Sequence, residues 1–300
     1  MASGAPLATS SRNAGPGGLA TAVIFLPPAL VLFTLFVILP VGEAAWYSFF
    51  NWNGLGPLDR VIGLANYVQA LTHSVFQRAF LNNLMIIAIS LGVQLPLALG
   101  LAMLLAERFR GAVAFRMIFF LPYILADVAA GLIWRFMFDG DYGPLSYLVQ
   151  WFGYPPLFLL ADRDFAYSTV LTVIVWKYFG FHMMLYIAGL QSIDRNLYEA
   201  ADIDGATPFQ RFWYVTLPQL GPMIRISVFF SLVGSLQVFD LIVPLTGGGP
   251  LNSTHTMVSY LYQFGVGRMR VGFGSAVGVI LFILCVTVAF SYKRWFMRND

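Results

Sequence analysis

Apolar residues gather in six long blocks along the chain, and shorter polar stretches separate them. The blocks span residues 19–41, 80–105, 117–138, 167–190, 224–245 and 273–292. A helix of about 20 apolar residues crosses the roughly 30 Å hydrocarbon core of a bilayer. Backbone groups in lipid must be satisfied inside a helix or a closed barrel, and the period-two alternation of barrel strands is absent. The pattern therefore predicts an all-α membrane protein with six transmembrane helices.

Composition supports this class and sets the limits of the domain. Hydrophobic residues make up 59% of the 300 positions and charged residues 10%, whereas about 25% of the residues of an ordinary soluble domain are charged. Residues 1–18 are rich in Ala, Gly, Ser and Pro and are predicted to form a disordered tail. We expect residues 19–292 to form one transmembrane domain and residues 293–300 a C-terminal tail.

Basic residues favour one side of the predicted helices. With the N-terminus inside, the cytoplasmic segments hold Arg12, Arg108, Arg110, Arg116, Arg195, Arg211, Lys293, Arg294 and Arg298, and the opposite side holds Arg60, Arg163, Arg268 and Arg270. By the positive-inside rule, both tails and the loop 191–222 are predicted to be cytoplasmic. The same bias explains most of the net charge of +3, so no nucleic-acid partner is expected.

The loop 191–222 carries the signals of a short helix. Asn196 and Glu199 fit an N-cap followed by a carboxylate three residues later. Gly205 fits a helix end at which the backbone turns left-handed. These residues predict a helix over residues 197–204.

A second helix signal follows directly. Thr207 as N-cap, Pro208 at the first helical position and Gln210 three residues after the cap form a capping box. We expect this helix to run to about Val215, because Pro218 cannot continue it. On physical grounds alone, an amphipathic connector lying on the membrane surface fits the loop equally well.

Five charged residues lie inside the apolar blocks: Asp127 and Arg135 in the third, Lys177 in the fourth, Asp240 in the fifth, and Arg225 at the cytoplasmic end of the fifth. Charges at membrane depth are costly, so they pair with one another or line a water-filled path. An ion pair between Lys177 and Asp240 is one such arrangement.

The fifth block also carries the polar residues Ser231, Ser235 and Gln237. The two serines lie one turn apart and share a helix face. Hydrogen bonds between helices account for these side chains.

The cytoplasmic loop contains Glu199-Ala200-Ala201, Asp204-Gly205-Ala206 and Thr216-Leu217-Pro218. In these residues and in their spacing it resembles the EAA loop of the permease subunits of binding-protein-dependent ABC importers. The resemblance continues in Gly63 to Tyr67, Leu121 to Tyr123, Ala188 to Gln191 and Leu245 to Pro250, which are similar to carbohydrate-uptake permeases of the maltose and glycerol-phosphate type. The resemblance implies the type I ABC importer permease fold, with six transmembrane helices and a cytoplasmic coupling helix, in the inner membrane of a prokaryote.

The resemblance also implies two sets of site residues. The residues that would couple to the ATPase are Glu199, Ala200, Ala201, Asp204, Gly205, Leu217 and Pro218. The substrate path would include Trp176, Lys177, Tyr178, Ser231, Ser235, Gln237 and Asp240. Maltose-type permeases have an Asn-rich stripe where this chain has Ser and Gln, so the resemblance does not identify the sugar.

The implied partners are a second homologous permease subunit, a cytoplasmic ATPase dimer, an extracytoplasmic solute-binding protein and membrane lipid. The implied cargo is a sugar or sugar-like solute. ATP and Mg would be bound by the ATPase, and no cofactor is expected on this chain.

The motifs of an enzyme are absent from the sequence. A phosphate-binding loop ends in Gly-Lys-Ser or Gly-Lys-Thr, but the only lysines, Lys177 and Lys293, follow a tryptophan and a tyrosine. The three histidines lack the spacing of a metal site, so neither catalysis nor a metal is expected. The alternatives are an ion-coupled secondary transporter with Asp127 or Asp240 as the ion site, a scaffold without transport, and an ABC importer permease for a non-sugar solute.

Overall fold

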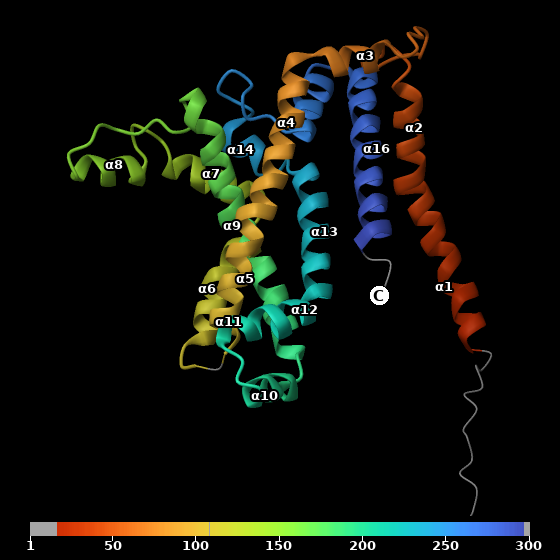
Figure 1. Cartoon of the computed structure of the whole chain (residues 1–300). Coiled ribbons are helices and arrows are strands. Elements are labelled where there is room, and N and C mark those ends of the chain that lie inside the picture. The colour runs from red at the N-terminus through yellow and green to blue at the C-terminus, as the bar shows by residue number, and fades with distance from the viewer. Residues whose placement is uncertain (1–16, 108, 297–300) are drawn as a thin grey trace, which may run out of the picture. The chain divides into compact units, whose positions relative to one another are not determined.

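The structure is a computed structural model that describes residues 17–107 and 109–296 (Figure 1). Helices dominate these residues, and the only strand-like pairing among them is an isolated bridge between Phe50 and Val61. Most of the predicted N-terminal tail, residues 1–16, and the last four residues, 297–300, lie outside the described part. The chain divides into two compact units after Trp46.

The first unit contains the first predicted span. Helix α1 (Gly17–Phe33) passes through the π-helical segment η1 (Thr34–Ile38) into α2 (Leu39–Tyr47). Residues Val23–Tyr47 are long and apolar enough to cross a membrane. This agrees with the predicted block 19–41, and the helix continues six residues further.

Three unbroken spans belong to the second unit. The first consists of α4 (Ser74–Ile89), the π-helical segment η2 (Ser90–Gln94) and α5 (Leu95–Ala106). The others are α9 (Arg163–Ser192) and α16 (Val271–Phe296). All three contain their predicted blocks, and α16 extends four residues beyond the predicted end of its block at 292.

Helix α9 is the central helix of this unit. Of its most apolar window, 56% is buried, against 22% for α16. One of its sides packs on α5 through small residues such as Ala98 and Ala102, while another packs on α7 (Asp127–Met137) and α14 (Ile242–Thr246). The buried polar side chains of α9, among them Lys177 and His182, are therefore surrounded by protein rather than by lipid.

The third predicted span, 117–138, is not one straight helix. It consists of α6 (Ala112–Ile124) and α7, which are bent by 97° at a break. Leu125 and Ala126 have the extended backbone of the break, with ψ of 141° and 139°. The prediction of a continuous span rested on apolar residues alone. A break frees backbone carbonyl groups, and side chains from other parts of the chain bind them, which the apolar pattern of this block cannot show.

The fifth predicted span, 224–245, is too long at its C-terminal end. Helix α13 (Gly221–Gln237) stops eight residues earlier, and α14 follows after a short irregular stretch. Two side chains bind carbonyl groups freed there: Asn83 donates to Ser235 at 2.7 Å and Thr256 donates to Val238 at 2.7 Å. Helix α4 lies beside α13, which allows the first of these bonds (Figure 1).

The remaining elements are short and connect the spans. They are α3 (Ala65–Thr72), α8 (Pro144–Trp151), α10 (Arg195–Ile203), α11 (Pro208–Arg211), η3 (Phe212–Thr216), α12 (Leu217–Gln219), α15 (Met257–Tyr260) and η4 (Leu261–Val266). Helix α12 meets α13 at a bend of 67°.

Candidate functional site: the capped loop and the broken spans

Helix α10 begins two residues before its predicted start. Its N-cap is Asp194, whose side chain accepts a hydrogen bond from the Asn196 backbone N–H at 3.0 Å. The prediction of Asn196 as the cap was wrong because both residues cap helices well and stand two positions apart.

The other end of α10 is as predicted. Gly205 has a φ of +73°, in the left-handed region. The Gly205 N–H donates to Asp202 at 3.1 Å and the Ala206 N–H donates to Ala201 at 2.9 Å. These are the two bonds of a Schellman motif, which satisfies carbonyl groups at a helix end.

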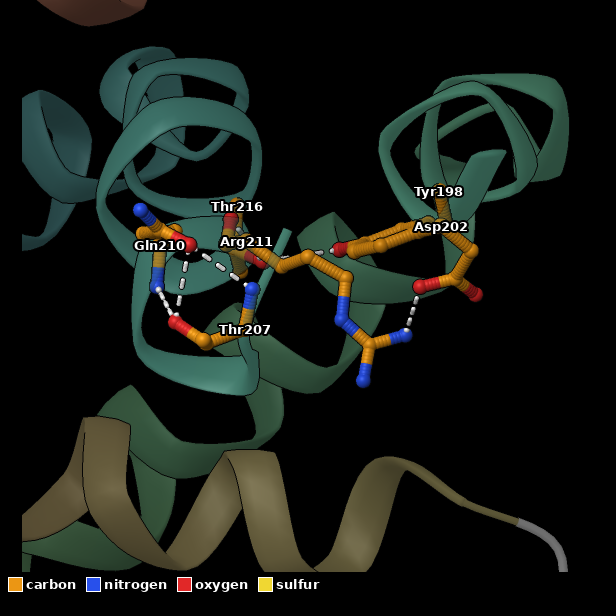
Figure 2. A network of polar contacts seen from close by, with 6 residues as sticks. All are labelled: Tyr198, Asp202, Thr207, Gln210, Arg211 and Thr216. Atoms are coloured by element: carbon orange, nitrogen blue, oxygen red, sulfur yellow. Dashed lines mark hydrogen bonds and ion pairs between the residues drawn. The ribbon is translucent and has the colours of Figure 1, made fainter. Parts of the chain in front are cut away.

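The predicted capping box is present at the start of α11 (Figure 2). The Gln210 N–H donates to Thr207 Oγ1 at 3.3 Å, and the Thr207 N–H donates to Gln210 Oε1 at 2.8 Å. Helical structure then continues through η3 and α12, so the prediction that Pro218 ends the helix was wrong. Pro218 is the second residue of α12, which directly follows a π-helical segment, so its missing N–H leaves no bond of α12 unmade.

Two side-chain contacts join the halves of the loop (Figure 2). Arg211 Nη1 lies 2.7 Å from Asp202 Oδ1, and the hydroxyls of Tyr198 and Thr216 are 3.0 Å apart. The ion pair is partly exposed and contributes less than about 1 kcal/mol to stability. Its effect is geometric, since α10 is fastened to the segment that continues into α13.

The outer surface of α10 combines small, apolar and acidic residues. Glu199, Ala200, Asp204 and Gly205 are exposed, Ala201 is half-buried, and Ile203 is 87% exposed. Farther along, Leu217 is half-buried and Pro218 is exposed. An exposed isoleucine beside two alanines makes a surface that another protein can approach closely.

Lys177 pairs with a different carboxylate from the one considered in the sequence. Its Nζ lies 3.1 Å from Asp127 Oδ1, on the other side of the break between α6 and α7. The side chain of Asp240 is exposed and makes no ion pair within the described part of the chain. The suggested Lys177–Asp240 pair is therefore wrong, and Asp127 rather than Asp240 neutralises the buried lysine.

The other residues of the predicted substrate path fall into two groups. Ser231 and Ser235 are buried within the chain, and Gln237 at the end of α13 is exposed. Trp176 and Tyr178 are half-buried; Trp176 packs edge-on against Trp134, and the Tyr178 hydroxyl donates to Asp127 Oδ2 at 3.1 Å. Their contact with a solute stays a prediction.

Sequence reasoning missed two adjacent asparagines of α4. Asn82 Nδ2 donates to the carbonyls of Ser253 and His255, both at 2.8 Å. Asn83 donates to Ser235 and accepts from the Met257 N–H at 2.9 Å. Two neighbouring amides inside an apolar block were the available signal.

Among the described residues, no group of three or more His, Cys, Asp or Glu is placed to hold a metal ion.

Within the described residues, four helices, or six if each bent pair is one span, are long and apolar enough to cross a bilayer, and this is the architecture of a multi-pass membrane protein. The family described as "Binding-protein-dependent transport system inner membrane component" matches residues 94–299, and the chain belongs to this family. It is thus an integral inner-membrane permease of an ABC importer, as the resemblance of the loop predicted.

Relatives of similar length cover nearly the whole chain. The sulfoquinovosyl glycerol permease SmoG of Agrobacterium fabrum is 34% identical over 280 residues, which are 93% of this chain and 91% of SmoG. The trehalose/maltose permease MalF of Thermococcus litoralis is 32% identical over 275 residues, covering 90% of this chain and 92% of MalF. The sn-glycerol-3-phosphate permease UgpA of Agrobacterium fabrum is 31% identical over 282 residues, covering 90% and 92%.

Solved structures show the same fold. A chain of a bacterial ABC transporter involved in the import of the polysaccharide alginate superposes with a TM-score of 0.82 at 23% identity, covering 94% of this chain and 96% of that one. A fold-level match over more than nine tenths of both chains confirms the predicted type I importer fold.

Proposed function

We propose that this permease carries a sugar or sugar-like solute, and that it works with a second homologous permease, a cytoplasmic ATPase dimer and an extracytoplasmic solute-binding protein. The observation that carries the proposal is the capped, exposed loop of α10 and α11, in which Arg211 and Tyr198 join α10 to the helical segment that leads into α13. Relatives named for sulfoquinovosyl glycerol, trehalose/maltose and glycerol phosphate support the class of solute. The description of the family as binding-protein-dependent supports the solute-binding partner.

In this proposal, ATP hydrolysis takes place on the ATPase subunits, and the loop transmits their movement. Glu199, Ala200, Ala201, Asp204, Gly205, Leu217 and Pro218 form the coupling surface. Because an ion pair joins α10 to α11 and a hydrogen bond joins α10 to η3, a displacement of α10 moves the base of α13 with it. Gln237 and Asp240 lie exposed at the far end of α13, where they would face the solute path.

The orientation proposed from the basic residues puts the α10 loop and both termini in the cytoplasm. Lys293 and Arg294, in the last turn of α16, agree with a cytoplasmic C-terminal end. The alternative of an ion-coupled carrier with Asp127 as its ion site has less support, because the ammonium of Lys177 already occupies that carboxylate.

The test is a pull-down from detergent-solubilised native membranes through a tag after Asp300. Three chains are compared: the native one, Glu199→Lys, and Glu107→Lys as a matched control that reverses an exposed carboxylate elsewhere on the proposed cytoplasmic side. We expect an ATPase and a second permease to co-purify with the native chain and with the control. Glu199→Lys should retain the permease and lose the ATPase.

Two results would contradict the proposal. Recovery of the folded native chain alone would contradict its assembly with an ATPase and a second permease. Retention of the ATPase by Glu199→Lys at native yield would place the coupling surface elsewhere.

A further inference from the structure

The break between α6 and α7 leaves carbonyl groups without helical partners. The last four carbonyls of any helix lack a partner N–H within it. Here α6 ends at Ile124, the next two residues are extended, and α7 begins only at Asp127. Unsatisfied backbone groups inside a membrane protein are costly, so something must bind these oxygen atoms.

The ammonium group of Lys177 binds them. Its Nζ lies 2.9 Å from the Pro122 carbonyl and 3.0 Å from the Tyr123 carbonyl, and the Leu125 carbonyl also accepts. Asp127 Oδ1 is the fourth oxygen, at 3.1 Å. An ammonium has three N–H donors, so these oxygens satisfy it fully, and its side chain is buried from solvent.

The charges around the ammonium are complementary. The C-terminal end of α6 carries the negative end of a helix dipole and points its carbonyls at Nζ, while the carboxylate of Asp127 stands at the positive N-terminal end of α7. The Tyr178 hydroxyl takes the second carboxylate oxygen. Each helix end at the break therefore meets a charge of the opposite sign.

The backbone of α9 fixes the position of Lys177. Gly180, one turn further along α9, lies so close to α6 that an added Cβ would stand 2.1 Å from the Phe119 carbonyl oxygen. Since α9 cannot move toward α6 and the break is held against it, the ammonium sits in a cage of defined size.

Carbonyl oxygens from unwound helix together with a carboxylate are the ligands that transport proteins use for small monovalent cations. We infer that Lys177 is a tethered cation: its ammonium fills an oxygen cage at the break of the third span and holds α6, α7 and α9 in their bent arrangement without a dissociable ion. This role concerns the permease itself and does not depend on which solute it carries.

The experiment measures the thermal unfolding midpoint of the complex purified from membranes, in choline, sodium, potassium and propylammonium chloride at equal ionic strength. The native complex and Lys293→Ala, which removes the only other lysine, should unfold at the same temperature in all four salts. Lys177→Ala should unfold about 5 °C or more lower in choline, because the cage is left without its cation. Propylammonium or a small metal ion should restore at least about half of that loss.

One further variant, Lys177→Arg, keeps the inference testable if Lys177→Ala fails to accumulate, and a second tests the carboxylate where Lys177→Ala does accumulate. Lys177→Arg keeps the charge but brings a planar group that does not fit a compact cage, so it should also be destabilised. Adding Asp127→Asn to Lys177→Ala should abolish the recovery by cations. A native midpoint for Lys177→Arg, or a loss in Lys177→Ala that is the same in all four salts, would overturn the tethered cation in favour of an ordinary ion pair.

Discussion

The backbone conformation of Gly205, and not the space around it, limits which residues can replace it. Its φ of +73° lies in the left-handed region, and no atom lies within 4 Å of the place where a Cβ would stand. A larger side chain therefore fits in space and strains only the turn between α10 and α11. A substitution at Gly205 therefore tests the backbone conformation of the turn without a steric clash.

Gly205→Val should lower solute uptake at normal expression, because a β-branched residue in the left-handed region costs roughly 1–2 kcal/mol. Gly205→Asn should keep more uptake, since asparagine visits this region readily. Gly100→Ala is the matched control, at a helical glycine that is equally open. Uptake of labelled solute by intact cells is the measurement, and a Gly205→Val variant with native uptake would show that the turn is dispensable.

His255 should make stability depend on pH. Burial lowers the pKa of His255 to about 4, so it stays neutral in the folded protein, whereas it titrates near 6.5 in the unfolded chain. Between these values the unfolded chain binds more protons, so stability falls as the pH falls from about 6.5 to 4, by at most roughly 1.4 kcal/mol per pH unit.

The measurement is the unfolding midpoint between pH 7 and pH 5. His255→Asn, which can still bond to Ser259, should show a smaller fall than the native protein. Some slope should persist, because burial and the nearby Arg268 and Arg270 also lower the pKa of His73. If the unfolding midpoint of the variant depends on pH as steeply as that of the native protein, His255 is not the cause of the dependence.

At the scale of elements, Asn83 joins three helices that are far apart in sequence. From α4 it donates to the last turns of α13 and accepts from the first residue of α15. The bond to α13 reaches across 152 positions. This one amide positions the end of α13 relative to the segment that follows α14.

Asn83→Ala should destabilise the protein by about 2–4 kcal/mol, because it leaves a buried carbonyl and a buried N–H without partners. Increased proteolysis near residues 247–256 should accompany the loss. Asn53→Ala, at an exposed asparagine, provides the comparison and should change little. Equal stability of the two variants would mean that the Asn83 bonds are replaced by others.

The long helices could be predicted from the sequence, whereas their breaks could not. The length of α9 or α16 follows from the thickness of the bilayer, which apolar blocks record directly. The break at Leu125 depends on Lys177, more than 50 positions away. In the loop, Gly205 and the Thr207–Gln210 box were predictable because their partners are local, but the continuation through Pro218 required the π-helical segment before it.

At the scale of the whole molecule, the second unit presents an unusually apolar outside. Of the most apolar windows, 28% is buried in Ser74–Ala106 and 22% in α16. Apolar surface on this scale is covered by lipid or by other membrane subunits. Lipid or other membrane subunits must therefore supply the rest of the environment that these helices need.

The orientation can be tested because the chain has a single cysteine, Cys285. In a Cys285→Ala background, Asp59→Cys should react with a membrane-impermeant maleimide on intact spheroplasts. Glu107→Cys should react only after the membrane is opened. Both positions are exposed, so access from one side of the membrane decides the outcome, and the reverse pattern would invert the proposed topology.

The contact between Lys177 and Asp127 also bears on how the protein is made. A lysine at the centre of a helix opposes insertion into the bilayer by roughly 2.5–3.5 kcal/mol. Asp127 and the open carbonyls of the break precede Lys177 along the chain. The ribosome therefore synthesises the groups that bind the ammonium before it synthesises Lys177. Lys177 and Asp127 can thus enter the membrane as a neutral pair, and α9 does not face lipid with the charge of Lys177 unpaired.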